Sequence, residues 1–551
     1  MIRRRRGFLL ILVIALLPGI LFLAYVMNRS LAQETVTAQQ ELARSRAFYL
    51  AEAGLELGFR ALAAENFRAA TLAPDGYHLA DSELREIGLA GRIQSRFPLS
   101  FDKHSGYYYW VSDPTVPQSS MNGSRVPESF RFAIFFPDET HFVVRSEGTF
   151  AHLTAAQELR GTLKPVTDFA VFDAGDLSDF VLDVDQAVKG SVHANGDLFL
   201  RPGQKTLTID GSLEAGGRLV RFRDAWQRPD AGGTVKIGDQ VMSGKSQSAS
   251  GKGQAFDSFH PKFAAEADKR FGGAVKDGAP QLYPPDPSAF EKGGFYARQA
   301  GLSLDPEQTT EGVSSASFYN PAEEHEVKCL DLDLGKLSLP ENGLVYSPVP
   351  VRLRSAHKLS APLTVVAPTI YTLGSFNKDK PVPAALIARD RVYHLSSQFA
   401  ELKETSKAPA KAKEAGNALE IHALVVDGVP TVDELKFVGS YNGQKAPQVK
   451  ANVRANSQDF LEDLRNLKVV RRGTVAHFQG ARMADFKNSD LDQGKAAWVM
   501  QTFANYHKLD YGYDAAFAEN PPPFVPKVAS RDHWFDLGVR QTGYNYKGRK
   551  R

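Results

Sequence analysis

The hydrophobic pattern of the chain opens with one unbroken apolar run. From Phe8 to Met27 no charged side chain occurs, and as a helix this segment would be about 30 Å long, which matches the hydrocarbon core of a bilayer. Arg3 to Arg6 precede it, and the positive-inside rule keeps such a cluster in the cytoplasm. We therefore expect a single pass through the inner membrane, with everything after Asn28 outside the cytoplasm.

The helical pattern continues beyond this run. Between Pro18 and Pro74 there is no proline, and the only glycines after Gly19 are Gly54 and Gly58. The residues after Asn28 are mostly strong helix formers, so one helix is expected from Phe8 to about Phe67, on the order of 90 Å long. Its halves would be 8–27 in the membrane and 28–67 outside it.

The outer half of this helix needs a surface to lie on, because propensity alone does not stabilise such a length. An apolar stripe at helical spacing is the predicted packing face; it consists of Leu31, Ala38, Leu42, Tyr49, Ala53 and Leu57. Gly54 and Gly58, four residues apart, would let another backbone approach closely. Residues 55–62 are expected to cover the protein's own core.

After Pro74 the period changes from helix to strand. Short aromatic and β-branched runs occupy 107–110, 130–136, 141–150 and 157–163, with turn residues such as Pro137-Asp138 between them. This pattern predicts an antiparallel meander of three or four strands within residues 68–165. The sheet would pack on the outer half of the helix.

A repeat follows within residues 166–242. "VKGSVHANGDLFL" and "IDGSLEAGGRLV" align so that Gly190 matches Gly211, 21 residues later, and Gly196 matches Gly217. Short strands punctuated by glycine at a fixed period are typical of stacked β-solenoid coils. The repeat therefore predicts solenoid coils, whose extent two copies do not fix.

The remaining sequence divides into two parts. Residues 243–340 are predicted as an irregular connector region. Residues 341–551 hold five further strand-like runs and are expected to form a β-rich C-terminal domain, with a mobile loop at the Lys- and Ala-rich stretch 403–418. The fold class is α+β: a long helix on an antiparallel sheet, followed by a large β-rich region.

Charge and cysteine content exclude several classes. Subtracting Arg3 to Arg6 from the net charge of +3 leaves about −1, so no general basic field would attract nucleic acid. Cys329 is the only cysteine, which rules out an intramolecular disulfide and a cysteine-based zinc site. With no cysteine near the apolar run, a lipoprotein anchor is also excluded.

Candidate chemistry is sparse. The Gly244-Lys245-Ser246 sequence lacks the earlier glycine of a phosphate-binding loop, since Asp239 stands there. The mixed cluster 323–326 reads as a solvated turn. A calcium site remains open for one group of aspartates, although the spacing of these residues is not that of an EF-hand. The group consists of Asp173, Asp176, Asp179, Asp183 and Asp185. No catalytic, cofactor-binding or metal residue is assigned, and we expect no enzyme.

The amino-terminal residues carry a family resemblance. A short basic leader ending in Gly7, then Phe8 and the apolar run, then "AFYLAEAGLELGFRAL" from Ala47 with Ala51 and Gly54 in its "AEAG", resemble type IV pilin-like proteins, in particular PilX-type minor pilins. The resemblance implies cleavage by a prepilin peptidase between Gly7 and Phe8, followed by packing of the helix among other pilins.

One position departs from the pattern of major pilins. Leu12 stands four residues after Phe8, where most pilins carry a glutamate that pairs with a neighbour's terminal amine. Some minor pilins and pseudopilins at the tip also lack this glutamate, so the resemblance implies a tip position. Pro18 would kink the helix, which a bundle or bilayer tolerates.

We therefore expect a low-copy minor pilin-like subunit that primes assembly or displays a β-rich surface-contact domain for cell adhesion. Its partners would be other pilins, the prepilin peptidase and the inner membrane, with a surface ligand or polysaccharide as a further candidate. Several alternatives stay open: a secretory or twin-arginine signal, a plain anchor, a membrane-tethered periplasmic enzyme or carbohydrate-binding protein, and a minor pseudopilin of type II secretion.

Overall fold

The computed structural model of the 551-residue chain describes these residues: 3–68, 100–102, 107–111, 128–151, 153–175, 177–181, 186–201, 205–221, 233–243, 256–260, 262–307, 310–320, 325–395, 419–427, 468–473, 475–478, 508–512, 517 and 520–541. Of residues 3–15 it describes the backbone path, but not the side chains.

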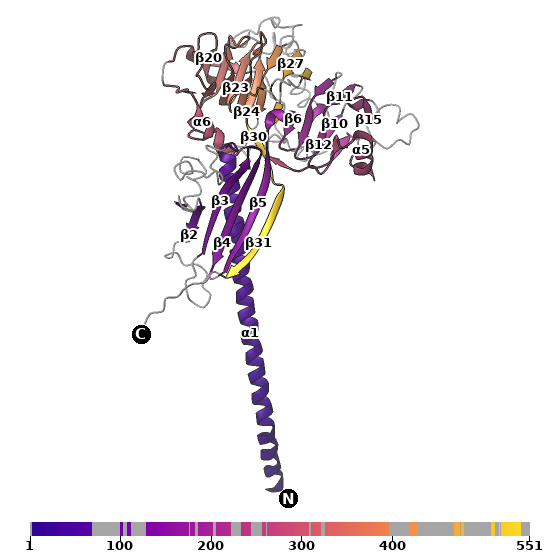
Figure 1. Cartoon of the computed structure of the whole chain (residues 1–551), viewed down its shortest axis with the longest axis vertical. Helices are drawn as coiled ribbons and strands as arrows, with labels where there is room; N and C mark the ends of the chain where they lie inside the picture. The colour runs from indigo at the N-terminus through magenta and orange to yellow at the C-terminus, as the bar shows by residue number, and fades with distance from the viewer. Residues whose placement is uncertain are drawn as a thin grey trace.

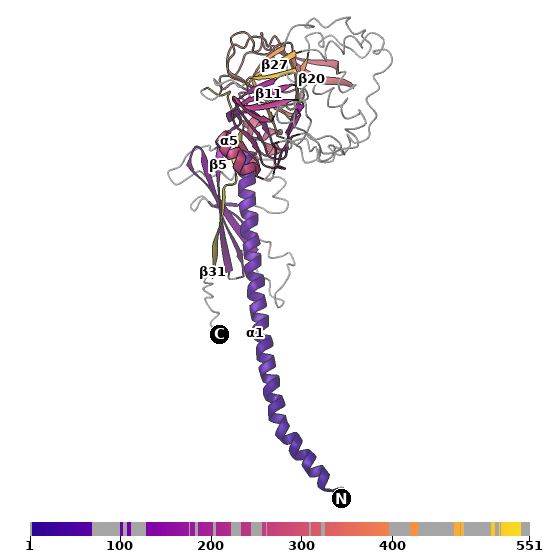
Figure 2. The ribbon, with the colours of Figure 1, turned by 90° about the vertical axis from the view of Figure 1, so that its right-hand side faces the viewer.

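A single long helix, α1 (Arg3–Ala64), confirms the prediction of a continuous amino-terminal helix. It runs without interruption through Pro18, and Figure 2 shows that its amino-terminal part curves. The helix ends where Asn66 and Phe67 take left-handed backbone angles, with φ of 55° and 52°, which an α-helix cannot continue. In Figure 1 its lower half extends well below the rest of the molecule.

An antiparallel meander covers the upper half of α1, as predicted, although it has five strands and not three or four. It consists, in spatial order, of β1 (Ser100–Asp102), β2 (Tyr107–Val111), β3 (Glu128–Asp138), β4 (His141–Phe150) and β5 (Leu153–Pro165). The aromatic residues of the strands alternate inward and form one core with the helix. This burial stabilises the part of α1 that propensity alone would not.

The far end of the chain completes this sheet. β30 (Lys527–Ser530) and β31 (His533–Gln541) both pair antiparallel with β5, and β30 also pairs with β17 (Leu282–Tyr283). The prediction that 341–551 forms one C-terminal domain was therefore wrong for residues 527–541. These strands lie beside β5 because its outer edge would otherwise leave a row of backbone groups unpaired.

The repeat corresponds to stacked parallel strands. Each strand of the first copy pairs with its equivalent in the second, in the pairs Val188–Ile209, Val192–Leu213 and Leu198–Leu219. β8 (Gln186–Lys189), β9 (Ser191–Ala194) and β10 (Leu198–Arg201) lie beside β11 (Thr206–Asp210), β12 (Leu213–Ala215) and β13 (Leu219–Arg221), respectively. β6 (Phe169–Asp173) and β7 (Leu177–Val181) pair with β9 and β10 in the same direction.

The second β-rich stretch joins the first in two sheets. β28 (Val475–His477) pairs with β6 in a 13-stranded sheet, and β29 (Lys508–Gly512) pairs with β8 in a 7-stranded sheet, both in parallel. The 13-stranded sheet continues through β26 (Leu424–Asp427), β24 (Ala384–Leu395), β23 (Leu363–Leu373), β22 (Val351–Arg354) and β20 (His325–Asp333). Regions 166–242 and 341–551, predicted as separate, thus share one stack of strands.

The segment predicted as an irregular connector contains regular structure. α5 (Phe263–Phe271) covers one end of the stack, and β19 (Val313–Asn320) forms an antiparallel hairpin with β20. Between them lie η2 (Pro287–Phe290) and α6 (Phe295–Gln299). A helix and a hairpin bury apolar residues that an open connector would expose, such as Phe263 and Phe318. The predicted loop 403–418 lies outside the described residues.

Candidate assembly surface on the long helix

The upper half of α1 meets the sheet through small side chains. Ala43, Ala47 and Ala51 recur at four-residue spacing, are buried, and pack on Phe150 and Ala155. Further along, the contact changes to large residues, Leu55, Phe59 and Leu62, which lie among the aromatic rings of the sheet. Small side chains therefore fill the space between the helix and the sheet near Ala47, and large side chains fill it toward Leu62.

Gly148 of β4 gives the closest approach between helix and sheet. A Cβ atom placed on Gly148 would lie 2.2 Å from the backbone nitrogen of Ala51 and 2.3 Å from the carbonyl oxygen of Ala47. These distances are far below van der Waals contact, so only glycine fits. The sequence interpretation did not single out Gly148, although a glycine inside a strand pattern is a signal of close backbone approach.

Gly54 and Gly58 also face the sheet. A Cβ on Gly54 would lie 2.4 Å from Ser146 Oγ, and one on Gly58 would lie 2.6 Å from Val144 Cγ1. The ring of Phe130 or Phe132 fills the remaining space beside each glycine. The two glycines thus admit side chains of the protein's own sheet, whereas the sequence predicted the close approach of another backbone.

The apolar stripe predicted as the packing face is only partly in contact with the sheet. Leu57 is half-buried and packs against the core of the sheet. Leu31, Leu42 and Tyr49 are 56%, 46% and 66% exposed, so the prediction was wrong for these three residues. The reason is steric. Between Ala43 and Ala51 the sheet approaches the helix so closely that only small side chains fit, and the larger residues Leu42 and Tyr49 consequently lie on the outer side.

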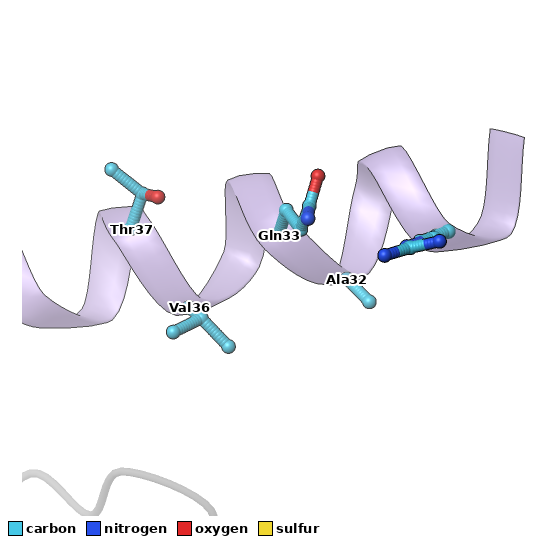
Figure 3. Close-up of a pocket in the computed structure, with 5 residues that line it drawn as sticks. Ala32, Gln33, Val36 and Thr37 are labelled. Atoms are coloured by element: carbon cyan, nitrogen blue, oxygen red, sulfur yellow. The ribbon is translucent and has the colours of Figure 1, made fainter. Parts of the chain in front are cut away.

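Residues 16–38 of α1 are exposed on all sides. The large apolar side chains between Leu16 and Met27 are 44% to 68% exposed. Arg29, Ala32, Gln33, Val36 and Thr37 line a shallow hollow on this part of the helix, and Figure 3 shows the labelled side chains spreading outward in different directions. In the part of the chain that the structure describes, no helix is long and apolar enough to cross a membrane.

Some predicted site residues are not available for comparison. For Gly7, and for residues 8–15 of the predicted membrane segment, including Phe8 and Leu12, the structure describes only the backbone. Pro18 lies inside α1, in its exposed part. Of the aspartates considered for calcium, only the side chain of Asp173 is described; it is buried and accepts a hydrogen bond from the backbone nitrogen of Gly175.

The repeat glycines stack on one another between coils. A Cβ on Gly211 would lie 2.4 Å from the backbone of Gly190, and one on Gly217 would lie 2.9 Å from that of Gly196. The backbone nitrogen of Gly217 donates to the carbonyl of Gly196 at 2.9 Å. Gly190 itself has φ of 120°, a conformation that favours glycine.

An ion pair joins the helix to the sheet, and others join neighbouring residues on the outer face of the sheet. Arg46 of α1 contacts Glu128 of β3 at 3.3 Å. On the outer face Glu158 is almost completely buried and accepts hydrogen bonds from Arg145 and Arg160. Burial alone would raise the pKa of Glu158, but the two guanidinium groups outweigh it and hold the pKa below its usual range.

Comparisons with known proteins give a structural likeness to a pilin. No family model matches the chain, and no curated protein matches it. Among solved structures, the chain is similar to the competence-associated pilin ComZ from Thermus thermophilus, with 13% sequence identity over 91% of this chain and 97% of that chain. The TM-score is 0.22, which is too low to establish a shared arrangement of the whole molecule.

Proposed function

We propose that this protein is a minor pilin-like subunit of a type IV pilus or a related filament, of the PilX type, present in low copy near the tip. One observation carries the proposal: α1 continues far below its sheet with large apolar side chains exposed, whereas its upper half is covered. A long apolar helix surface of this kind is stabilised when it packs against similar helices.

The amino terminus would be processed before assembly. In this proposal a prepilin peptidase cleaves between Gly7 and Phe8, and the helix resides in the inner membrane until it enters the filament. Leucine at position 12, in place of a carboxylate that would pair with a neighbour's amine, supports a place at the end of the filament, where one of the two neighbours is missing.

The β-rich part would be the portion displayed for surface contact, and we assign it no catalytic role. We propose that its strands form coils of a β-solenoid. Parallel pairing of equivalent repeat positions and the stacked glycines Gly190–Gly211 and Gly196–Gly217 support this proposal.

Site-specific cross-linking tests the assembly surface. Cys329 is buried, and burial raises the pKa of its thiol to about 11, so it reacts poorly. A cysteine introduced by Leu31→Cys should therefore be the reactive one and should cross-link to other subunits in cells that build filaments. Phe259→Cys, which is 52% exposed on the β-rich part, is the control. Equal cross-linking from both positions, or none from Leu31→Cys, would refute the proposal.

A further inference from the structure

Residues 523–531, named here the strap, lie where distant parts of the chain meet. Four successive backbone carbonyls of the strap each accept a hydrogen bond from a different element. The carbonyl of Pro523 accepts from Thr364 Oγ1 of β23, and that of Phe524 accepts from Tyr296 Oη of α6. The carbonyl of Val525 accepts from Asn66 Nδ2 just beyond α1, and that of Pro526 accepts from the backbone nitrogen of Val166 just beyond β5. The strap thus joins the helix, its sheet and the β-rich part.

The Asn66 side chain holds the strap with both of its polar atoms. Its Nδ2 donates to the carbonyl of Val525 at 3.3 Å, and its Oδ1 accepts from the backbone nitrogen of Lys527 at 3.2 Å. Asn66 is fully buried, so its amide group depends on these two bonds for the partners that water would otherwise supply.

The composition of the strap suits a buried connection. The strap contains two prolines, Pro523 and Pro526, and two more, Pro521 and Pro522, directly precede it; proline has no backbone N–H. The prolines can therefore cross the interior without leaving a donor unpaired, while their carbonyls remain available as acceptors. This explains how four consecutive carbonyls can serve four different partners.

Arg531 closes the strap against α1. Its guanidinium lies 4.0 Å from the ring centroid of Phe59 and 4.5 Å from that of Tyr283, and it pairs with Glu56 at 2.9 Å. β31, the edge strand of the helix-covered sheet, begins two residues later at His533. The edge strand is therefore joined directly to the strap, two residues after Arg531.

We propose that the strap is a latch that couples the β-rich part to the helix-covered sheet, so that the sheet is complete only when the β-rich part is folded and docked. The two parts then open and close as one cooperative unit. This coupling does not depend on whether the chain enters a filament.

Hydrogen exchange of the full-length protein tests the latch. Thr364→Val removes the hydroxyl that binds Pro523, on the β-rich side of the strap. The matched control is Thr372→Val in the same strand, another buried threonine, whose hydroxyl bonds within the β-rich part to the carbonyl of Tyr393. Tyr296→Phe removes a second anchor, at Phe524, without changing the ring.

The latch predicts an effect at a distance. Thr364→Val and Tyr296→Phe should each raise exchange in β31 and β5 by about three- to tenfold, the change expected for one buried hydrogen bond, and Thr372→Val should not. If exchange rises only around the substituted residue while β31 and β5 keep their protection, the latch is wrong. An equal rise in β31 with Thr372→Val would also overturn it. Should Thr364→Val fail to fold, Tyr296→Phe decides between these outcomes.

Discussion

Gly148 of β4 lies directly against the backbone of α1 at Ala51, at a separation that leaves no space for a side-chain carbon. This contact sets the distance between the helix and the sheet. It also determines which side of α1 is covered, and so which residues remain outside for another molecule.

Gly148→Ala should destabilise the protein. The added methyl group would meet backbone atoms of Ala47 and Ala51, which cannot rotate away as a side chain can. We expect a loss of about 1–3 kcal/mol in the free energy of unfolding, the usual cost of overpacking, measured by urea denaturation. Gly335→Ala, where the nearest atom is Ser355 Cβ at 3.3 Å, should change stability by less than about 0.5 kcal/mol. Equal effects of the two substitutions would contradict this account of the contact.

Tyr49 lies on the exposed outer face of α1, and Ala47 lies on the buried face that packs against the sheet. Tyr49→Arg changes a side chain that is 66% exposed, so it should leave the unfolding temperature nearly unchanged and reduce the protein in sheared filament fractions. Ala47→Arg places a charge at a fully buried position and should lower the unfolding temperature strongly. Normal recovery of Tyr49→Arg in filaments would show that the outer face is not used for assembly.

The lowered pKa of Glu158 predicts that the folded protein loses stability in acid. The folded-state pKa of this residue lies below its unfolded-state pKa, which is about 4.3 for a free glutamate. The stabilisation is therefore present above the unfolded pKa and is lost as the pH falls through the lower, folded pKa. Glu158→Gln should lower stability at neutral pH and flatten the decline below about pH 4, as measured by chemical denaturation across pH. Glu307→Gln, at an exposed position, is the control, and an unchanged acid profile in Glu158→Gln would disprove the assignment.

Arg531 should contribute more to stability than Arg540, although both lie near β5. Arg531 stacks on two aromatic rings and is mostly covered, whereas the side chain of Arg540 is 63% exposed in its pair with Glu147. We expect Arg531→Ala to cost about 1–3 kcal/mol and Arg540→Ala less than about 1 kcal/mol. Thermal unfolding of the two variants side by side measures the difference, and the reverse order would contradict the role given to Arg531.

The local patterns predicted the elements that depend on neighbouring residues. The helix follows from an apolar run and from strong helix formers with no proline between Pro18 and Pro74, and the meander follows from strands joined by short turns, so both could be predicted from the sequence. The 21-residue repeat likewise predicted which residues pair, because each strand stacks on its own equivalent.

Contacts between distant parts of the chain could not be predicted in this way. Trp534 pairs with Leu159 across most of the sequence, and no local period marks β31 as a strand of the amino-terminal sheet. The packing face of α1 was misjudged because a hydrophobic stripe identifies apolar residues without showing what faces them. Small residues at Ala47, Ala51 and Gly54 were the better guide, since the sheet presents large rings to them.

The amino terminus of the protein in sheared filaments tests the central claim most directly. Mass spectrometry of this fraction should find the chain present and beginning at Phe8, because the leader is removed before the helix joins its neighbours. A chain found only in the detergent-soluble membrane fraction, with Met1 intact, would contradict the proposal that this protein is a filament subunit.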